Sequence, residues 1–135
     1  MLFVDTSAWW AIHDRSQPSH RAVVAAVREA KRARTSLVTS DYVVDETLTL
    51  VRAKAGHAPA VAVGDAIWRR GGAEVFLVDE AVRDSAWAIF TKYADHNLSF
   101  TDCTSAALMR QRGIETALTL DSDFAVLGFD VRPRP

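Results

Sequence analysis

Four acidic residues of this chain stand where folding could gather carboxylates into one crevice: Asp5, Glu46, Asp102 and Asp121. Asp5 and Asp121 each follow a short apolar run, and carboxylates at the ends of parallel strands converge at the usual ligand site of an open α/β sheet. Two such charges about 5 Å apart repel by roughly 3 kcal/mol at an effective dielectric of about 20. A proton or a cation must relieve that repulsion, which favours a metal site over an apolar pocket.

The chemistry that such a site suits best is phosphodiester hydrolysis. Mg²⁺ and Mn²⁺ prefer oxygen ligands, and a shallow crevice with several carboxylates supplies them without histidine or thiolate. A water bound to the ion can lose its proton near neutral pH, and the same ion can neutralise charge on a phosphorus centre. We therefore expect a metal-activated water as the nucleophile, with either one ion or two.

Each acidic residue also has a purely structural interpretation. Asp5 and Asp121 could cap the helices that follow them, and Asp102 could respond only to a helix dipole. Glu46 is harder to explain in this way, because it lies in the middle of an expected helix among apolar neighbours. Asp123 is the closest rival of Asp121 and could be an additional ligand. It is the joint placement of all four that favours a site.

Alternating short apolar runs and helical periodicities position these residues, and they predict one α/β domain over residues 1–135. The expected strands are 2–4, 36–39, 75–78, 116–120 and 129–132. The expected helices are 7–12, 18–30, 41–55, 59–70, 80–94 and 102–112, with a single turn at 123–127. Strand–helix alternation predicts a mainly parallel central sheet that helices cover on both faces.

The composition is that of an ordinary globular domain, with 49% hydrophobic residues and 24% charged residues. The formal net charge of -1 gives no global attraction to nucleic acid, so any such binding must come from a local patch. Cys103 is the only cysteine, which excludes an internal disulfide and suggests a small core residue. No apolar run approaches a membrane span, and we expect a cytoplasmic protein.

Several other kinds of site lack their motifs in this sequence. No glycine-rich dinucleotide or phosphate-binding loop follows the first strand, and no serine nucleophile elbow occurs. The four tryptophans are expected to pack helices against the sheet or against a partner chain, and an aromatic platform that stacks bases is the alternative. The tryptophans are Trp9, Trp10, Trp68 and Trp87.

The sequence resembles the PIN-domain ribonucleases, and most closely the VapC-type toxins of bacterial toxin–antitoxin pairs. The matching segments occur in the order of that family and span the chain: residues 3–7, 40–46, 98–102 and 118–124. The resemblance implies a PIN-like three-layer α/β/α sandwich with an endoribonuclease site that depends on Mg²⁺ or Mn²⁺.

The resemblance also assigns roles to residues and implies partners. It makes Asp5, Glu46, Asp102 and Asp121 the catalytic metal ligands, with Asp123 as an auxiliary and with Thr6, Ser7 and Thr101 as polar residues that support the ligands or a bound water. It implies an RNA substrate, a homodimer, and an antitoxin whose tail occupies the active-site groove and places an arginine against the carboxylates.

Substrate binding needs local positive charge, and Arg52 and Lys54 are the candidates nearest to Glu46 in sequence. Two other functions stay open at this point. A receiver-type phosphoacceptor domain has a similar fold with an acidic Mg²⁺ pocket, and Asp79 after the third strand would then be its phosphorylated residue. A non-catalytic interaction module would keep the fold and use only its surface.

Overall fold

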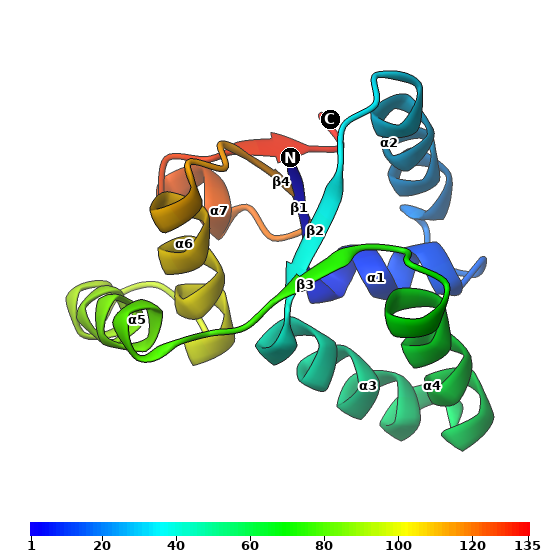
Figure 1. The fold of residues 1–135 in the computed structure, drawn as a ribbon, viewed down its shortest axis with the longest axis horizontal. Helices are drawn as coiled ribbons and strands as arrows, with labels where there is room; N and C mark the ends of the chain where they lie inside the picture. Colours follow the sequence, from blue (N-terminus) through cyan, green and yellow to red (C-terminus); the bar gives the residue numbers. More distant parts are fainter.

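The computed structural model describes residues 1–135 and contains a five-stranded sheet with helices around it (Figure 1). The strands are β1 (Leu2–Val4), β2 (Leu37–Ser40), β3 (Glu74–Phe76), β4 (Thr116–Leu118) and β5 (Asp130–Arg132). The helices are α1 (Thr6–His13), α2 (His20–Arg32), α3 (Asp41–Ala55), α4 (His57–Gly64), η1 (Asp65–Arg69), α5 (Glu80–Lys92), α6 (Phe100–Arg112) and α7 (Asp123–Val126).

All neighbouring strands pair in parallel, in the order β3-β2-β1-β4-β5. From β1 the chain proceeds to one edge of the sheet, and from β4 it proceeds to the other. The direction therefore switches between β1 and β4, where Val4 pairs with Leu118. The crevice beyond the carboxyl ends of the strands at such a switch is the usual ligand site. Asp5 and Thr119 follow directly from these two strand ends.

Helices lie on both sides of the sheet, which confirms the expected α/β sandwich with a parallel sheet. Figure 1 shows α5, α6 and α7 on one side, with α1, α2 and α4 on the other. Helix α3 begins at the carboxyl end of β2 and contacts α1, α4 and α6. It therefore joins the two sides at the end of the sheet where the crevice lies.

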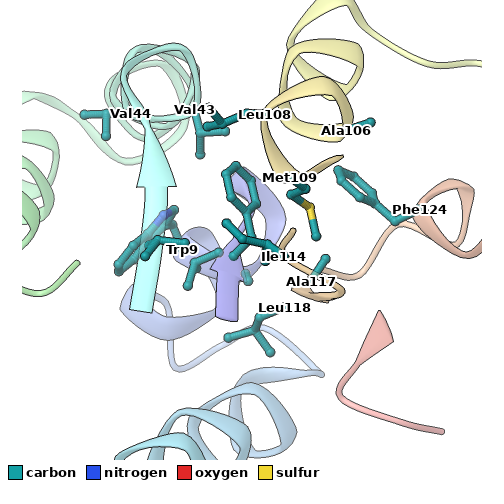
Figure 2. Packing of buried hydrophobic residues seen from close by; sticks show 14 of the residues in the cluster. Trp9, Val43, Val44, Ala106, Leu108, Met109, Ile114, Ala117, Leu118 and Phe124 are labelled. Carbon is teal, nitrogen blue, oxygen red and sulfur yellow. The ribbon is translucent and has the colours of Figure 1, made fainter. Parts of the chain in front are cut away.

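The core lies between the central strands and these helices, and the labelled side chains of Figure 2 come from α1, α3, α6, α7, β4 and the loop before β4. All of β1 is buried, as the uninterrupted apolar run of a central parallel strand requires. Burying a side chain such as Phe3 contributes roughly 1.5–3 kcal/mol. Cys103 is buried as expected, and Trp9 is buried as well. None of the helices combines the length and apolar character needed to cross a bilayer.

Several expected helices differ from the structure at their ends, among them α2, which covers His20–Arg32 instead of 18–30. Helix α6 begins at Phe100 and not at Asp102, because Ser99 rather than a later residue caps it. The helix expected over 59–70 begins at His57, and a π-helical turn replaces regular α-helix from Asp65 onward. Trp68 on that turn and Trp87 on α5 are 56% and 59% exposed, so neither is covered by the sheet, and contact with a partner chain stays a prediction.

Candidate metal centre

The Asp5 carboxylate is held by a residue after β4 and does not cap the helix that it precedes. It stands at the N-cap of α1, yet its side chain accepts no capping hydrogen bond. Its Oδ2 accepts instead from Thr119 Oγ1 at 2.9 Å and from Ser7 Oγ at 3.3 Å. Its Oδ1 has no partner and is the one buried side-chain oxygen or nitrogen in the structure that lacks one. Helix capping therefore does not explain why an aspartate occurs at this position. Burying a carboxylate oxygen without a hydrogen-bond partner costs free energy.

Asp102 combines a structural role with an available oxygen. The Ser99 N–H donates to Asp102 Oδ2 at 2.9 Å, and the Asp102 N–H donates to Ser99 Oγ at 3.0 Å, which completes a capping box. Asp102 therefore has a structural role at the start of α6, as the partner of Ser99 in a capping box and not through the helix dipole alone. It uses only one carboxylate oxygen, and the reciprocal pair fixes the orientation of the other.

Asp121 is held in a tight turn beyond β4. Its N–H donates to Thr119 Oγ1 at 3.0 Å, and its Oδ1 accepts from the Asp123 N–H at 2.9 Å. Asp123 itself faces His96, with His96 Nδ1 and Asp123 Oδ1 3.8 Å apart. The backbone of the auxiliary residue Asp123 is therefore part of the turn that orients Asp121, while its carboxylate faces His96.

Glu46 lies half-buried on α3, and its charge raises the pKa of both Asp5 and Asp102. It therefore lies near both carboxylates although it comes from a different helix. Its neighbour Asp45 is exposed, since adjacent helical residues point about 100° apart. Asp79, the residue that a receiver domain would phosphorylate, caps α5 by accepting from the Val82 N–H at 2.8 Å.

The electrostatics couple all four acidic residues. Burial raises the pKa of Asp5 to about 7, and the charges of Asp102 and Glu46 add to the rise. Burial likewise raises the pKa of Asp102 to about 6 against the lowering effect of Ser99, with contributions from Asp121 and Glu46. None of the five ion pairs in the structure includes any of the four carboxylates. The protein itself supplies no cation for this crevice.

The donor set fits a hard divalent cation. Every candidate ligand is a carboxylate oxygen, the ligand type that Mg²⁺ and Mn²⁺ prefer, and Asp5 Oδ1 is a buried acceptor without a donor. No three histidine, cysteine, aspartate or glutamate side chains already stand in the arrangement of a formed ion site. Asp102 is coupled electrostatically to the other three carboxylates, and holding one shared cation would require these side chains to move toward it.

The expected supporting residues differ in what they do. Ser7 contacts Asp5 and also accepts from the Leu120 N–H at 2.9 Å, which ties the start of α1 to the loop after β4. The Thr6 N–H lowers the pKa of Asp5, whereas its Oγ1 accepts from Thr47 at 3.5 Å. Thr101 uses its carbonyl oxygen to accept from two side chains further along α6. Support of a bound water by Thr6 or Thr101 stays a prediction.

Arg52 and Lys54 are exposed near the end of α3. They stand about 9 and 12 Å beyond Glu46 along the helix axis, at 1.5 Å per residue. Arg52 lines a hollow of about 400 Å³ between α3, α4 and η1, together with Trp68 and Arg69. RNA binding by Arg52 and Lys54 stays a prediction.

Thr119 is the central residue that the sequence analysis missed. It is buried, it donates to Asp5 Oδ2, it accepts from the Asp121 N–H, and its Oγ1 lies 3.2 Å from Ser7 Oγ. One hydroxyl thus links the residues after β1 and after β4. The sequence predicts that Thr119 belongs to a strand over 116–120, but β4 ends at Leu118. A hydroxyl two residues before an aspartate in an otherwise apolar run was the available signal.

A Thr119→Val variant should keep the shape of this link and lose its hydrogen bonds. We expect a loss of about 1–3 kcal/mol in the free energy of unfolding, because buried groups lose their partner. Cleavage should fall by about 10- to 100-fold, as is typical when a residue that orients a metal ligand is lost. The hydrogen bond from Thr119 lowers the pKa of Asp5, so the pH profile of cleavage should move to higher pH. Urea unfolding and a cleavage pH profile measure these effects, with Thr116→Val at the start of β4 as the control. An unchanged pH profile of the Thr119→Val variant would contradict the role.

Comparison with known proteins places this chain in a family. Residues 2–130 match the PIN domain family. The 23S rRNA-specific endonuclease VapC20 of Mycobacterium tuberculosis is 36% identical to this chain, over 98% of the chain and 99% of that protein. Ribonuclease VapC26 of the same organism is 31% identical, over 89% of the chain and 86% of that protein.

Solved structures agree with the fold. The crystal structure of Mycobacterium tuberculosis VapC20, described as a sarcin–ricin loop cleaving toxin, superposes with a TM-score of 0.87 and 32% identity over the full length of both chains. VapBC2 from Rickettsia felis, solved bound to a DNA fragment from its promoter, gives a TM-score of 0.75 at 11% identity, covering 98% of each chain. The second likeness concerns the fold alone.

Proposed function

This chain belongs to the PIN-domain family, among the VapC-type endoribonuclease toxins of toxin–antitoxin systems, and we propose that it hydrolyses RNA with Mg²⁺ or Mn²⁺ held by its four crevice carboxylates. The observation that carries the metal assignment is the buried, unpartnered Oδ1 of Asp5 in a crevice without a cation of its own. Burial without a cation also raises the pKa of Asp5, and a bound divalent ion would lower that pKa again.

In this proposal Asp5, Glu46, Asp102 and Asp121 are the ligands, and Asp123 is an auxiliary. A bound Mg²⁺ or Mn²⁺ supplies a more acidic water and neutralises charge on the phosphate that is attacked. Thr119 and Ser7 hold Asp5 Oδ2, so Oδ1 keeps its direction into the crevice. Asp5 and Asp102 are partly protonated near neutral pH, and both release their protons when they become ligands.

The negative charge of the crevice and the positive charge of α3 bear on which substrate can bind and where. The crevice is acidic, so a phosphate can approach only when a cation masks the carboxylates. Arg52 and Lys54 offer positive charge along α3 to neighbouring phosphates. VapC20 is named for cleavage of 23S rRNA; for this chain we propose RNA as the substrate class.

The proposed protein partners are an antitoxin and a second copy of the chain. An antitoxin arginine would find several carboxylates that no protein cation neutralises, which suits a bidentate guanidinium contact. Occupation of the crevice in this way would also exclude the metal ion. The homodimer is proposed from family membership.

A matched pair of variants on α3 tests the catalytic assignment. Glu46→Gln removes one ligand charge, and we expect cleavage to fall by at least about 100-fold, equivalent to roughly 3 kcal/mol of transition-state stabilisation. Asp45→Asn makes the same chemical change on the neighbouring exposed residue and should leave cleavage unaltered. The measurement is single-turnover cleavage of total RNA in Mn²⁺. Equal activity of the two variants would remove Glu46 from the site.

The toxin role has a separate readout. Expression of the wild-type chain should arrest growth, and the Glu46→Gln variant should not. Growth arrest by the Glu46→Gln variant as well as by the wild-type chain would mean that toxicity does not come from the nuclease site.

A further inference from the structure

Four aromatic rings lie in contact beside the carboxylate crevice: Tyr42, Phe100, Phe90 and Trp87, which we call the aromatic track. The ring centroids of Tyr42 and Phe100 are 6.5 Å apart, and those of Phe100 and Phe90 are 5.9 Å apart in an edge-to-face arrangement. Trp87 lies 5.7 Å from Phe90 in a stacked arrangement and 6.4 Å from Phe100. The track therefore runs from α3 across the start of α6 to α5.

The inner end of the track adjoins the catalytic residues. Tyr42 precedes Glu46 by four positions on α3, so their side chains are neighbours on one helix face, with Cβ atoms about 5–6 Å apart. Phe100 is the first residue of the helix that carries Asp102. A nucleotide chain whose phosphate lies at the carboxylates thus has the first of these rings within reach.

The outer end of the track is open to solvent. Trp87 is 59% exposed and Phe90 is 41% exposed, although each has a large apolar ring that would ordinarily be covered. A hollow of about 380 Å³ lies between Trp87 and Phe100, and its other lining residues are Arg83 and Asp84. Arg83 makes only a loose 3.8 Å pair with Glu80, so its guanidinium is available.

We propose that the aromatic track is a base-stacking subsite for unpaired nucleotides of the RNA substrate, next to the cleaved phosphate. Single-stranded RNA is bound by stacking its splayed bases on aromatic side chains and by hydrogen bonds to the base edges. The hollow provides both elements: Trp87 and Phe100 as the stacking surfaces, and a guanidinium donor and a carboxylate acceptor in Arg83 and Asp84. This inference rests on the proposed ribonuclease function.

A second copy of the chain is the competing occupant of an exposed aromatic face. Two features favour RNA. The rings lead directly to the carboxylates, as a substrate-binding surface would, and the hollow carries two charged residues where the core of a dimer interface is depleted of charge. Oligomeric state therefore belongs in the test.

The test uses the full chain with Glu46→Gln added to prevent cleavage, and a short single-stranded oligoribonucleotide that contains a fluorescent purine. We expect the purine fluorescence to be quenched on binding. Trp87→Ala should weaken binding about fivefold to a hundredfold, as loss of one stacked base does, whereas Trp87→Phe should retain most of the affinity. Trp68→Ala removes an equally exposed tryptophan on η1 and is the matched control. In the cleaving chain, Trp87→Ala should raise KM and leave kcat unchanged.

Each outcome decides the proposal. Weaker binding by Trp87→Ala, with the molar mass in sedimentation unchanged, supports it. Unchanged binding overturns it, and so does conversion of a dimer to a monomer by the same substitution, because a second copy would then cover the track. If the wild-type chain cleaves RNA in either of these cases, the ribonuclease function stands and only the stacking subsite falls. Absence of both binding and cleavage in the wild-type chain would overturn the function itself.

Discussion

An Asp5→Asn variant is expected to lose RNA cleavage by at least about a thousandfold, because it removes a ligand from an ion that supplies several kcal/mol of transition-state stabilisation. The same variant should be more stable than the parent chain at alkaline pH. Both effects come from one carboxylate that is buried without a cation and without a partner for Oδ1. Few substitutions would abolish an activity and stabilise the protein together.

The sign of the stability change follows from the raised pKa. The Asp5 carboxyl keeps its proton up to about pH 7 in the folded chain and releases it near 3.8 in the unfolded chain. Stability therefore falls as the pH rises between these values, and the full penalty, at most about 4 kcal/mol, applies above pH 7. Asparagine removes the charge. Its amide group, however, would occupy the position where Asp5 Oδ1 now lies without a partner, and the amide N–H groups would find no acceptor there. We expect a net gain of about 1–3 kcal/mol at about pH 8 and little gain at about pH 4.

Urea unfolding at the two pH values measures this gain, and cleavage is measured in Mn²⁺. The control is Asp79→Asn, which changes the aspartate after β3 in the same way. Asparagine caps a helix as well as aspartate does, so its stability should change by less than about 0.5 kcal/mol and its cleavage should not change. An Asp5→Asn chain that cleaves like the parent, or that is destabilised at alkaline pH, would contradict the assignment.

Divalent cations should stabilise the folded chain strongly, and more at high pH than at low pH. Mn²⁺ at about 100 times its dissociation constant should add about 2.7 kcal/mol to the free energy of unfolding. Ligands must be deprotonated to bind, and the pKa values of Asp5 and Asp102 are raised to about 7 and about 6. At about pH 8 both groups are ionised and the ion binds fully, whereas at about pH 5 protons compete and most of the gain should vanish.

Thermal unfolding with and without Mn²⁺ at these pH values tests this expectation, and a chelator should abolish cleavage while the fold persists. The Asp5→Asn, Glu46→Gln double variant is the control and should show no stabilisation by Mn²⁺ at either pH. A gain of equal size at both pH values, or an equal gain in the double variant, would place the ion elsewhere.

The sequence predicted the architecture well, for a physical reason, and the site role of the acidic residues stays a prediction. Uninterrupted apolar runs such as Leu2–Val4 can be buried only in a central parallel strand, and the aspartate that follows must then emerge at the carboxyl end of the sheet. Glu46 was recognisable because a charge among apolar helical neighbours needs a partner. The electrostatic coupling of the four carboxylates agrees with their predicted convergence.

The parts that escaped prediction depend on contacts between distant residues. Thr119 matters because Asp5 lies beside it across the β1–β4 pairing, and no local pattern reveals that contact. The start of α6 differs from the predicted start because Ser99 and Asp102 each accept a hydrogen bond from the other's N–H group, which places Asp102 inside the first turn. The exposed rings of Trp68 and Trp87 look like core residues in sequence, since the same apolar side chain serves a core or a binding surface.

The hydrogen bond between Asp5 and Thr119 joins residues 114 positions apart. While the ribosome is still making the chain, the first strand and its aspartate emerge early, but the strand that must pair beside them is among the last segments synthesised. Non-local pairings of this kind also form late and slowly in folding. The hydrogen bond between Asp5 and Thr119 therefore cannot form until translation is nearly complete, and neither can the nuclease centre that we propose.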